Sequence, residues 1–214
     1  MKGRGLTNIG IMATVASIAT VAALVATPAS ATGLDVANFS FEDPSIGGGF
    51  IDGVPGWTTT GSDPSGILVS TNFGMASDDG VQNAWLNAGS LSQTVAATAQ
   101  AGVNYTLRVD LGQRPDDVPT VANIFLVVGG HTILGTGQPL VTGDWTTYIA
   151  SYTALAGDDG AAISIILQQV DHQSEFDNVR LNATPLPAAL PLFGTGLGVL
   201  GLLGWRRKRK PLAT

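Results

Sequence analysis

The stretch Tyr105-Thr106-Leu107-Arg108-Val109-Asp110-Leu111 decides the fold, because apolar and polar side chains alternate along it. Successive side chains of a β-strand point to opposite faces, so the four apolar residues of this stretch share one face. The same alternation returns at Ile163, Ile165 and Leu167. We therefore predict half-buried strands at both places, with these apolar residues in the core.

Short runs of this kind recur between residues 32 and 183, and each is closed by Gly, Asp, Asn or Pro. No long helical pattern interrupts them, and only 96–101 could be read as a helical turn. Closely spaced short strands are typical of an antiparallel sandwich. We predict an all-β fold, a single jelly-roll β-sandwich domain over 32–183, with strands at 36–41, 67–71, 83–86, 91–95, 105–111, 124–128, 146–152, 163–169 and 175–181.

Charge divides the chain of 214 residues into three parts. Residues 35–180 contain all 16 acidic residues and only three of the ten basic residues, so this stretch carries a net charge of −13. Such a surface repels a phosphate backbone, and we expect no nucleic-acid partner. The chain has no Cys, which excludes disulfides, thiolate metal sites and cysteine nucleophiles.

The N-terminal part has the layout of a secretory signal peptide. Lys2 and Arg4 precede an apolar run, and Ala29 and Ala31 then form a small-residue cleavage site. We assign residues 1–31 to this signal and expect signal peptidase to cleave after Ala31. An uncleaved signal anchor is the alternative, because the apolar run is long.

The C-terminal part predicts a transmembrane helix over 186–205, a stretch of twenty residues without a charge. Five basic residues follow it, and the positive-inside rule keeps such a cluster in the cytoplasm. A helix pair packed through Gly194, Gly198 and Gly201 is an alternative use of this segment. The basic cluster consists of Arg206, Arg207, Lys208, Arg209 and Lys210.

Residues 184–210 resemble the PEP-CTERM protein-sorting tail in its VPLPA variant. The resemblance rests on a proline motif at 184–192, a Gly/Leu-rich span and the basic cluster, in that order. It implies an exosortase that recognises the tail through a short segment. The segment carried over by the motif is Pro185, Leu186, Pro187 and Ala188. The implied location is an exported protein, first an inner-membrane-anchored precursor with a cytoplasmic C-terminus and then a protein of the outer surface or extracellular matrix.

The central domain resembles galactose-binding-like and DUF642-type carbohydrate-binding jelly rolls. The resemblance rests on the opening Asn38-Phe39-Ser40-Phe41-Glu42-Asp43-Pro44, on Pro55-Gly56-Trp57 and on the closing Phe176-Asp177-Asn178-Val179-Arg180-Leu181. It implies that the first and last strands are neighbours. It also implies a structural Ca²⁺ bound by Glu42 and Asp177, whose carboxylate oxygens suit this cation. Without the resemblance, both are solvated acids at strand ends.

Aromatic rings beside amide side chains suggest a surface for sugars. Trp57 and Trp145 are expected to turn inward or to begin a strand, which leaves Trp85, flanked by Asn83 and Asn87, as the candidate solvent-facing ring. The alternative is that this ring fills the core. Adjacent acids such as Asp78-Asp79 are turn formers rather than a glycosidase pair.

These features together predict an exosortase-sorted, non-catalytic extracellular or cell-surface protein that binds glycan or forms part of an exopolysaccharide or biofilm matrix. We expect no enzyme activity and no catalytic residues. One alternative is a polysaccharide hydrolase or lyase, which requires the clustered acids to converge in a groove. The other is a cell-surface adhesion module for protein partners, which requires a flat apolar patch.

Overall fold

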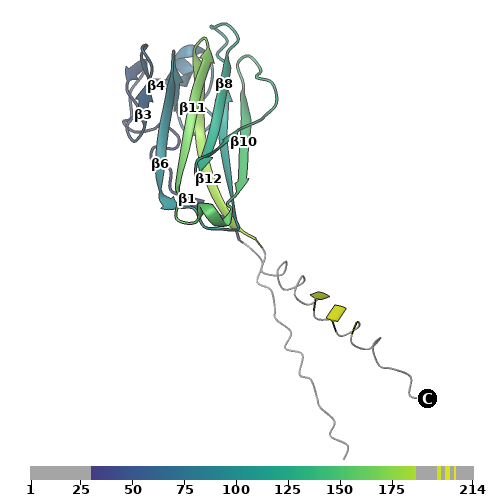
Figure 1. The fold of residues 1–214 in the computed structure, drawn as a ribbon. Helices are drawn as coiled ribbons and strands as arrows, with labels where there is room; N and C mark the ends of the chain where they lie inside the picture. Colours follow the sequence, from purple (N-terminus) through teal and green to yellow (C-terminus); the bar gives the residue numbers. More distant parts are fainter. Residues whose placement is uncertain (1–29, 187–196, 199–200, 203–204, 206–214) are drawn as a thin grey trace, which may run out of the picture.

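The computed structural model describes residues 30–186, 197–198, 201–202 and 205. Within this part the chain forms a sandwich of two β-sheets, and every strand pair is antiparallel (Figure 1). The seven-stranded sheet has the order β10-β7-β12-β5-β4-β2, with β1 also paired to β12. The five-stranded sheet has the order β3-β6-β11-β8-β9. The predicted all-β sandwich is therefore confirmed.

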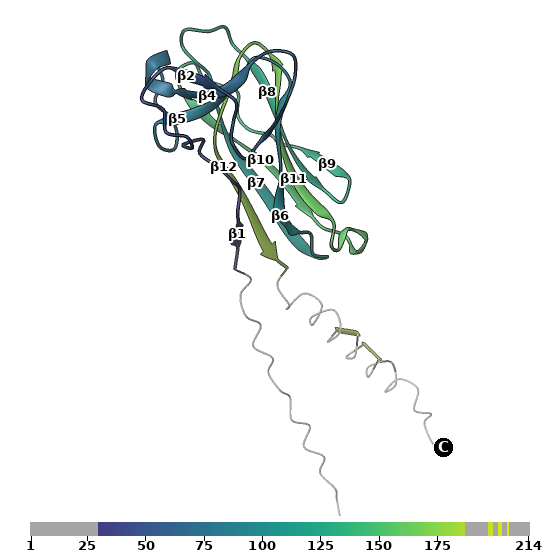
Figure 2. The same cartoon turned by 90° about the vertical axis from the view of Figure 1, so that its left-hand side faces the viewer.

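The seven-stranded sheet brings distant parts of the sequence side by side. Its last strand, β12, pairs with β1, β5 and β7, so the two ends of the domain meet at Thr32 and Ala183 (Figure 2). The strands of this sheet are β1 (Thr32–Leu34), β2 (Phe50–Asp52), β4 (Ser65–Val69), β5 (Gln82–Leu86), β7 (Val103–Gly112), β10 (Trp145–Thr153) and β12 (Ser174–Pro185).

The five-stranded sheet covers one face of the seven-stranded sheet, and the core lies between them. Its strands are β3 (Thr58–Thr60), β6 (Ser90–Thr98), β8 (Val121–Val128), β9 (His131–Leu134) and β11 (Ala162–Asp171). Two 3-10 turns complete the described elements, η1 (Ser70–Phe73) and η2 (Ala156–Asp158).

The core is made by the apolar side chains that alternate along the strands. Leu107, Val109 and Leu111 of β7 and Ile163 and Ile165 of β11 are fully buried, as the period-two pattern predicts. Trp57 packs on the same cluster and donates from Nε1 to the Ala37 carbonyl. Burying apolar side chains is the main favourable contribution to folding, so this layer fixes the two sheets against each other.

The strand prediction is confirmed for eight runs and wrong for one. Residues 36–41 form turns instead of a strand, with Asn38 and Phe41 at positive φ and the Phe41 amide donating to the Asn38 carbonyl. The first strand is instead β1, which precedes this segment and pairs with β12. Strands β1, β2, β3 and β9 were not predicted, because they have three or four residues and little buried apolar surface.

The helices expected on both sides of the sandwich are not supported. The predicted signal segment and most of the predicted 186–205 segment lie outside the described residues, as does the basic cluster 206–210. In the part of the chain that the structure describes, no helix combines the length and apolar character needed to span a membrane. The expectation of an inner-membrane-anchored precursor is corrected by this finding.

Candidate active site

The outer face of the seven-stranded sheet, which points away from the core, carries the candidate site. Ala84 and Leu86 of β5 are in the core cluster, so alternation turns Asn83 and Trp85 to the outer face. On β12, Phe176 faces the core and Glu175 therefore faces outward. Register places Glu175 directly opposite Trp85. Two strands far apart in sequence thus set an aromatic ring beside a carboxyl group.

A cavity of about 150 Å³ lies on this outer face. Phe50 of β2 meets Trp85 edge to face, with 5.6 Å between ring centroids, and Phe73 at the end of η1 adds a third ring. The lining residues are Phe50, Leu68, Phe73, Trp85, Asn87, Arg114 and Gln173. The cavity is therefore mostly aromatic, with polar side chains from the segments that follow β5 and β7 and from the turn before β12.

Glu175 adjoins this cavity and is 1% exposed. Its Oε2 accepts a hydrogen bond from Asn83 Nδ2 at 2.5 Å, and Asn83 Oδ1 accepts one from Ser70 Oγ at 2.5 Å. All three side chains are buried, so this chain of hydrogen bonds fixes the orientation of the carboxyl group. Its other oxygen, Oε1, is buried without a hydrogen-bond partner.

The protonation of Glu175 follows from its surroundings. Burial raises the pKa of Glu175 to about 8, although the Arg114 guanidinium and the Asn83 hydrogen bond lower it. The group is therefore largely neutral at pH 7. Because Oε2 accepts from Asn83, the proton of the neutral acid belongs on Oε1. The site therefore holds a carboxylic acid with an unpaired O–H group, in the manner of a general acid.

Arg114 lines the cavity close to Glu175, and several neighbouring side chains hold it in place. Its NH1 lies 3.8 Å from Glu175 Oε1, too far for a hydrogen bond. The guanidinium lies 4.2 Å above the Phe73 ring and forms a bidentate pair with Asp116. It also donates to Gln173 Oε1, and Gln173 Nε2 donates to Asn87 Oδ1 at 2.8 Å. These polar side chains form the rim of the cavity.

The sequence predicts that Trp85, Asn83 and Asn87 form one ligand site, and the structure shows where each of these residues lies. The structure brings all three to the same region, with Trp85 and Asn87 lining the cavity and Asn83 bonded to Glu175. The expected exposure of Trp85 is wrong, because its ring is 5% exposed and packs against Phe50. Trp85 is thus a wall of a cavity and not a flat platform.

Glu42 and Asp177 lie against the same loop, between η1 and β5. Glu42 Oε1 accepts from the amides of Val81 and Gln82 at 2.6 and 2.7 Å. Asp177 Oδ2 accepts from the amides of Asp78 and Asp79 at 3.0 and 2.9 Å, and burial raises the pKa of Asp177 to about 8. Backbone amides thus bind one oxygen of each carboxyl group, and calcium binding at Glu42 and Asp177 stays a prediction.

Other acidic and histidine side chains do not converge on a metal site. Among the described residues, no group of three or more His, Cys, Asp or Glu is arranged to hold an ion. His131 lies near Asp158, with Nε2 to Oδ1 at 3.4 Å, and stacks on Tyr152. Asp158 also accepts from the Tyr152 hydroxyl at 2.8 Å. This cluster ties β9 and β10 to η2 and lies apart from the cavity at Trp85.

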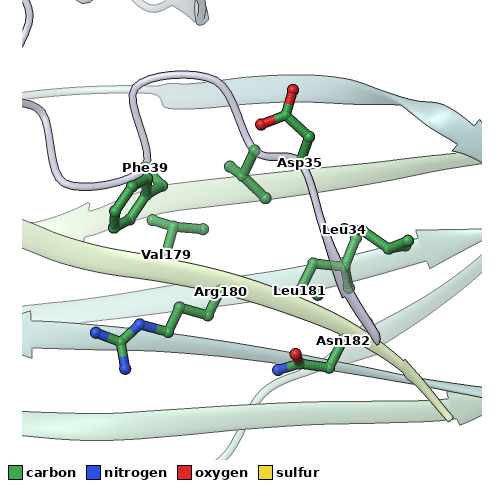
Figure 3. A pocket seen from close by; sticks show the side chains of 9 residues that line it. Leu34, Asp35, Phe39, Val179, Arg180, Leu181 and Asn182 are labelled. Carbon is green, nitrogen blue, oxygen red and sulfur yellow. The ribbon is translucent and has the colours of Figure 1, made fainter. Parts of the chain in front are cut away.

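A larger cavity of about 490 Å³ lies beside β1 and β12, but it offers less chemistry (Figure 3). Figure 3 shows Leu34, Asp35 and Phe39 on one side and the side chains of β12 on the other. Phe39 is 42% exposed, and the exposed Arg180 lies 3.6 Å from Asp79. No buried acid or base lines this cavity, whereas Arg114 in the wall of the smaller aromatic cavity lies 3.8 Å from the buried Glu175. The smaller cavity is therefore the better candidate active site.

Sequence reasoning missed Glu175 and Arg114 as members of one site. In the sequence, Glu175 is only the first residue of the predicted strand 175–181, and Arg114 is only one of the few basic residues of the acidic stretch. The available signal was a carboxyl group directly before the buried Phe176, in a strand where charge is costly. The pairing of Glu175 with Trp85 depends on strand register, which the sequence pattern does not specify.

Comparison with known proteins gives a family match. The model of the HpiC1-like family, described as HpiC1 cyclase, matches residues 32–182. No curated protein matches the chain. Among solved structures, a cyclase from Fischerella sp. TAU has 23% identity and a TM-score of 0.64, covering 73% of this chain and 98% of that one.

Two complexes show the same fold. The Stig cyclase Fisc from Fischerella sp. TAU, in complex with (3Z)-3-(1-methyl-2-pyrrolidinylidene)-3H-indole, has 21% identity and a TM-score of 0.65. It covers 73% of this chain and 99% of that chain. A cyclase from the same organism, in complex with 4-(1H-indol-3-yl)butan-2-one, has 19% identity and a TM-score of 0.65. That match covers 72% of this chain and 98% of the other.

These findings correct the interpretation drawn from the two resemblances. The family match covers the sandwich and names cyclases, so the assignments to PEP-CTERM and to galactose-binding-like or DUF642-type proteins are not supported. The expectation of a non-catalytic, exosortase-sorted glycan-binding protein is wrong for the same reason. The tail motif spans about thirty residues outside the matched region, and within it Pro185 ends β12 and Leu186 follows. It was therefore a poor guide to what the domain does.

Proposed function

Because the chain belongs to the HpiC1-like cyclase family, we propose that it is an enzyme that closes a ring within its substrate by proton transfer from Glu175. The observation that carries the proposal is the unpaired Oε1–H expected of a neutral, buried Glu175 beside an aromatic cavity. A positioned acid whose pKa lies near the working pH is an efficient proton donor.

The proposed reaction is an isomerisation. The Glu175 O–H bond breaks and its proton adds to an alkene carbon or imine nitrogen of the substrate, which leaves a cation. An internal π bond attacks the cation and forms the new ring bond, and loss of one proton to Glu175 restores the acid. The rings of Trp85, Phe50 and Phe73 favour the positive charge through their π faces. Asn83 keeps the carboxyl group oriented through Oε2.

Arg114 has to move before the substrate reaches the acid. Its guanidinium lines the cavity and lies 3.8 Å from Glu175 Oε1. The pairs with Asp116 and Gln173 and the contact with Phe73 hold it at the rim when no substrate is present. We propose that substrate entry shifts the guanidinium away from Oε1 and that the acid then meets the substrate directly.

The proposed substrate is an indole-type compound with an unsaturated side chain. The solved cyclases were captured with indole compounds, and the fold of this chain is the same. The volume of about 150 Å³ suits a single ring system, since an apolar cavity of that size holds a benzene molecule. The side chain of the substrate then extends along the rim toward Arg114.

The experiment that tests this proposal incubates the full-length chain with a panel of 3-alkenyl indoles in H₂O and in D₂O. We expect a product of unchanged mass and altered chromatographic retention in H₂O, and incorporation of one deuterium in D₂O. Glu175→Gln keeps the shape and the Asn83 contact but removes the acid. It should lower the rate at least about 100-fold, the usual contribution of a general acid.

The matched control is Asp52→Asn, which removes an exposed carboxyl group from β2 on the same sheet. This variant should keep the rate of the wild type. Full activity in Glu175→Gln would exclude this residue as the proton donor, and a product without carbon-bound deuterium would exclude proton transfer to the alkene carbon of these substrates.

A further inference from the structure

Two buried polar atoms beside the candidate active site have no hydrogen-bond partner. They are Trp85 Nε1 and Glu175 Oε1, on residues that face each other across β5 and β12. Trp85 is 5% exposed and Glu175 is 1% exposed, so water does not freely solvate either atom. An unsatisfied buried donor destabilises the folded protein, and such atoms are rare in folded proteins. Because Trp85 also lines the cavity, its unused N–H group points to a ligand that accepts from it.

The other tryptophans of the sandwich show what is unusual about Trp85. Trp57 donates from Nε1 to the Ala37 carbonyl at 3.1 Å, and Trp145 donates from Nε1 to the Ala76 carbonyl at 2.7 Å. Both bonds are internal and fix the rings to neighbouring segments. The Trp85 ring is placed instead by its packing against Phe50, which leaves its N–H group unused.

Around the cavity, hydrogen bonds within the protein already occupy several side-chain acceptor oxygens, whereas the Trp85 N–H donor has no partner. Asn87 Oδ1 accepts from Gln173, and Gln173 Oε1 accepts from Arg114. Glu175 Oε2 accepts from Asn83. Trp85 lines the cavity, so a ligand there meets an indole N–H group that needs an acceptor.

We propose that Trp85 selects the substrate by donating its indole N–H to it, so that the cavity takes a neutral ring compound with a carbonyl or imine acceptor. In the bound state the acceptor of the ligand takes the hydrogen bond from Trp85 Nε1–H. This inference rests on the proposed function only in placing the substrate in the same cavity. It adds a specificity residue to the proton donor.

The test compares two ring compounds of nearly equal size, 1-indanone, which has a carbonyl group, and indane, which lacks it. Each is titrated into the full-length ¹⁵N-labelled chain while the tryptophan Nε1–H resonances are recorded by NMR. We expect 1-indanone to move the Trp85 resonance downfield and indane to leave it without a downfield shift. The resonances of Trp57 and Trp145 are internal controls, because their N–H groups already have acceptors.

Trp85→Phe identifies the Trp85 resonance by its disappearance and keeps an aromatic ring in the wall. In the wild type we expect 1-indanone to bind about tenfold more tightly than indane, the effect of one good hydrogen bond. In Trp85→Phe this preference should vanish while indane binding changes little. If Trp85 had only a structural role, Trp85→Phe would bind both compounds more weakly by the same factor, and this result would overturn the inference.

The remaining outcomes separate this inference from the proposed function. If Trp85→Phe keeps the preference for 1-indanone, Trp85 is not the donor, and the role of Glu175 as proton donor is unaffected. If the wild type binds neither compound, both the inference and the assignment of the cavity as the substrate site are overturned. A loss of activity in Glu175→Gln with an unchanged Trp85 resonance would support the acid and contradict the selection step.

Discussion

Glu175 is held between opposing electrostatic influences, and their balance sets its chemistry. Burial disfavours the carboxylate and is the larger effect, so the pKa rises to about 8. Arg114 and Asn83 act in the opposite direction, because a positive charge and a donated hydrogen bond both favour the ionised form. The residue is thus neutral near pH 7, yet close enough to its pKa to take the proton back after the reaction.

Replacing Arg114 by Met should raise the pKa of Glu175 further. The variant keeps an apolar side chain over Phe73 but removes the positive charge that lies 3.8 Å from Oε1. The measurement is a titration of the Glu175 side-chain carbonyl carbon by ¹³C NMR, with the resonance assigned through Glu175→Gln. An unchanged or lower pKa in Arg114→Met would show that the guanidinium does not act on the acid.

At the scale of elements, the outer wall of the cavity depends on the pairing of β2 with β4. Gly66 of β4 lies where β2 passes so closely that an added Cβ would stand 1.8 Å from the Ile51 carbonyl oxygen. Phe50, one residue away on β2, is the ring that packs against Trp85. A glycine is therefore required for β2 to reach its place.

Gly66→Ala should displace β2 and open the aromatic wall. We expect a lower melting temperature and loss of the contact between Phe50 and Trp85, seen as faster hydrogen exchange at the amides of β2 and β4. Gly47→Ala is the matched control, because an added Cβ there meets nothing within 4 Å. Equal melting temperatures for the two variants would contradict the close approach.

The sequence predicted the elements that bury apolar surface and missed those that do not. Alternation located β7 and β11 because their inner faces are fully apolar. Strands such as β2 and β3 have three residues each and are held by neighbouring strands, so local pattern carries little signal for them. The same limit applies to the site. Trp85 and the amide side chains of Asn83 and Asn87 were predicted together because they are adjacent in the sequence. Glu175 lies 90 residues further along the chain, and strand register brings it opposite Trp85.

The whole molecule combines an acidic surface with carboxyl groups that are neutral inside. Glu175 and Asp177 each have a pKa of about 8 in the folded chain, against ordinary values of 4.5 and 3.8. Between those ordinary values and about 8, the folded form keeps protons that the unfolded form releases. The free energy of unfolding therefore falls as pH rises through this window.

We expect the protein to be more stable at pH 5 than at pH 8, and Glu175→Gln to reduce this difference. Each fully buried group contributes a slope of at most about 1.4 kcal/mol per pH unit. Chemical denaturation at several pH values measures the slope, with Asp52→Asn as the control for loss of one surface charge. A slope equally steep in Glu175→Gln would show that this carboxyl group is already ionised in the folded chain.

The pairing of β1 with β12 joins the two ends of the sandwich at one pole, while the aromatic cavity lies near β2, β4 and β5 at the other (Figure 2). Thr32 and Ala183 are direct partners, so a short peptide could link them without distortion. A circular permutant opened at the Gly129-Gly130 turn should then keep the aromatic wall of the cavity intact. For the same reason, attaching the sandwich to a resin through β1 or β12 would leave the opening of the aromatic cavity facing the solution.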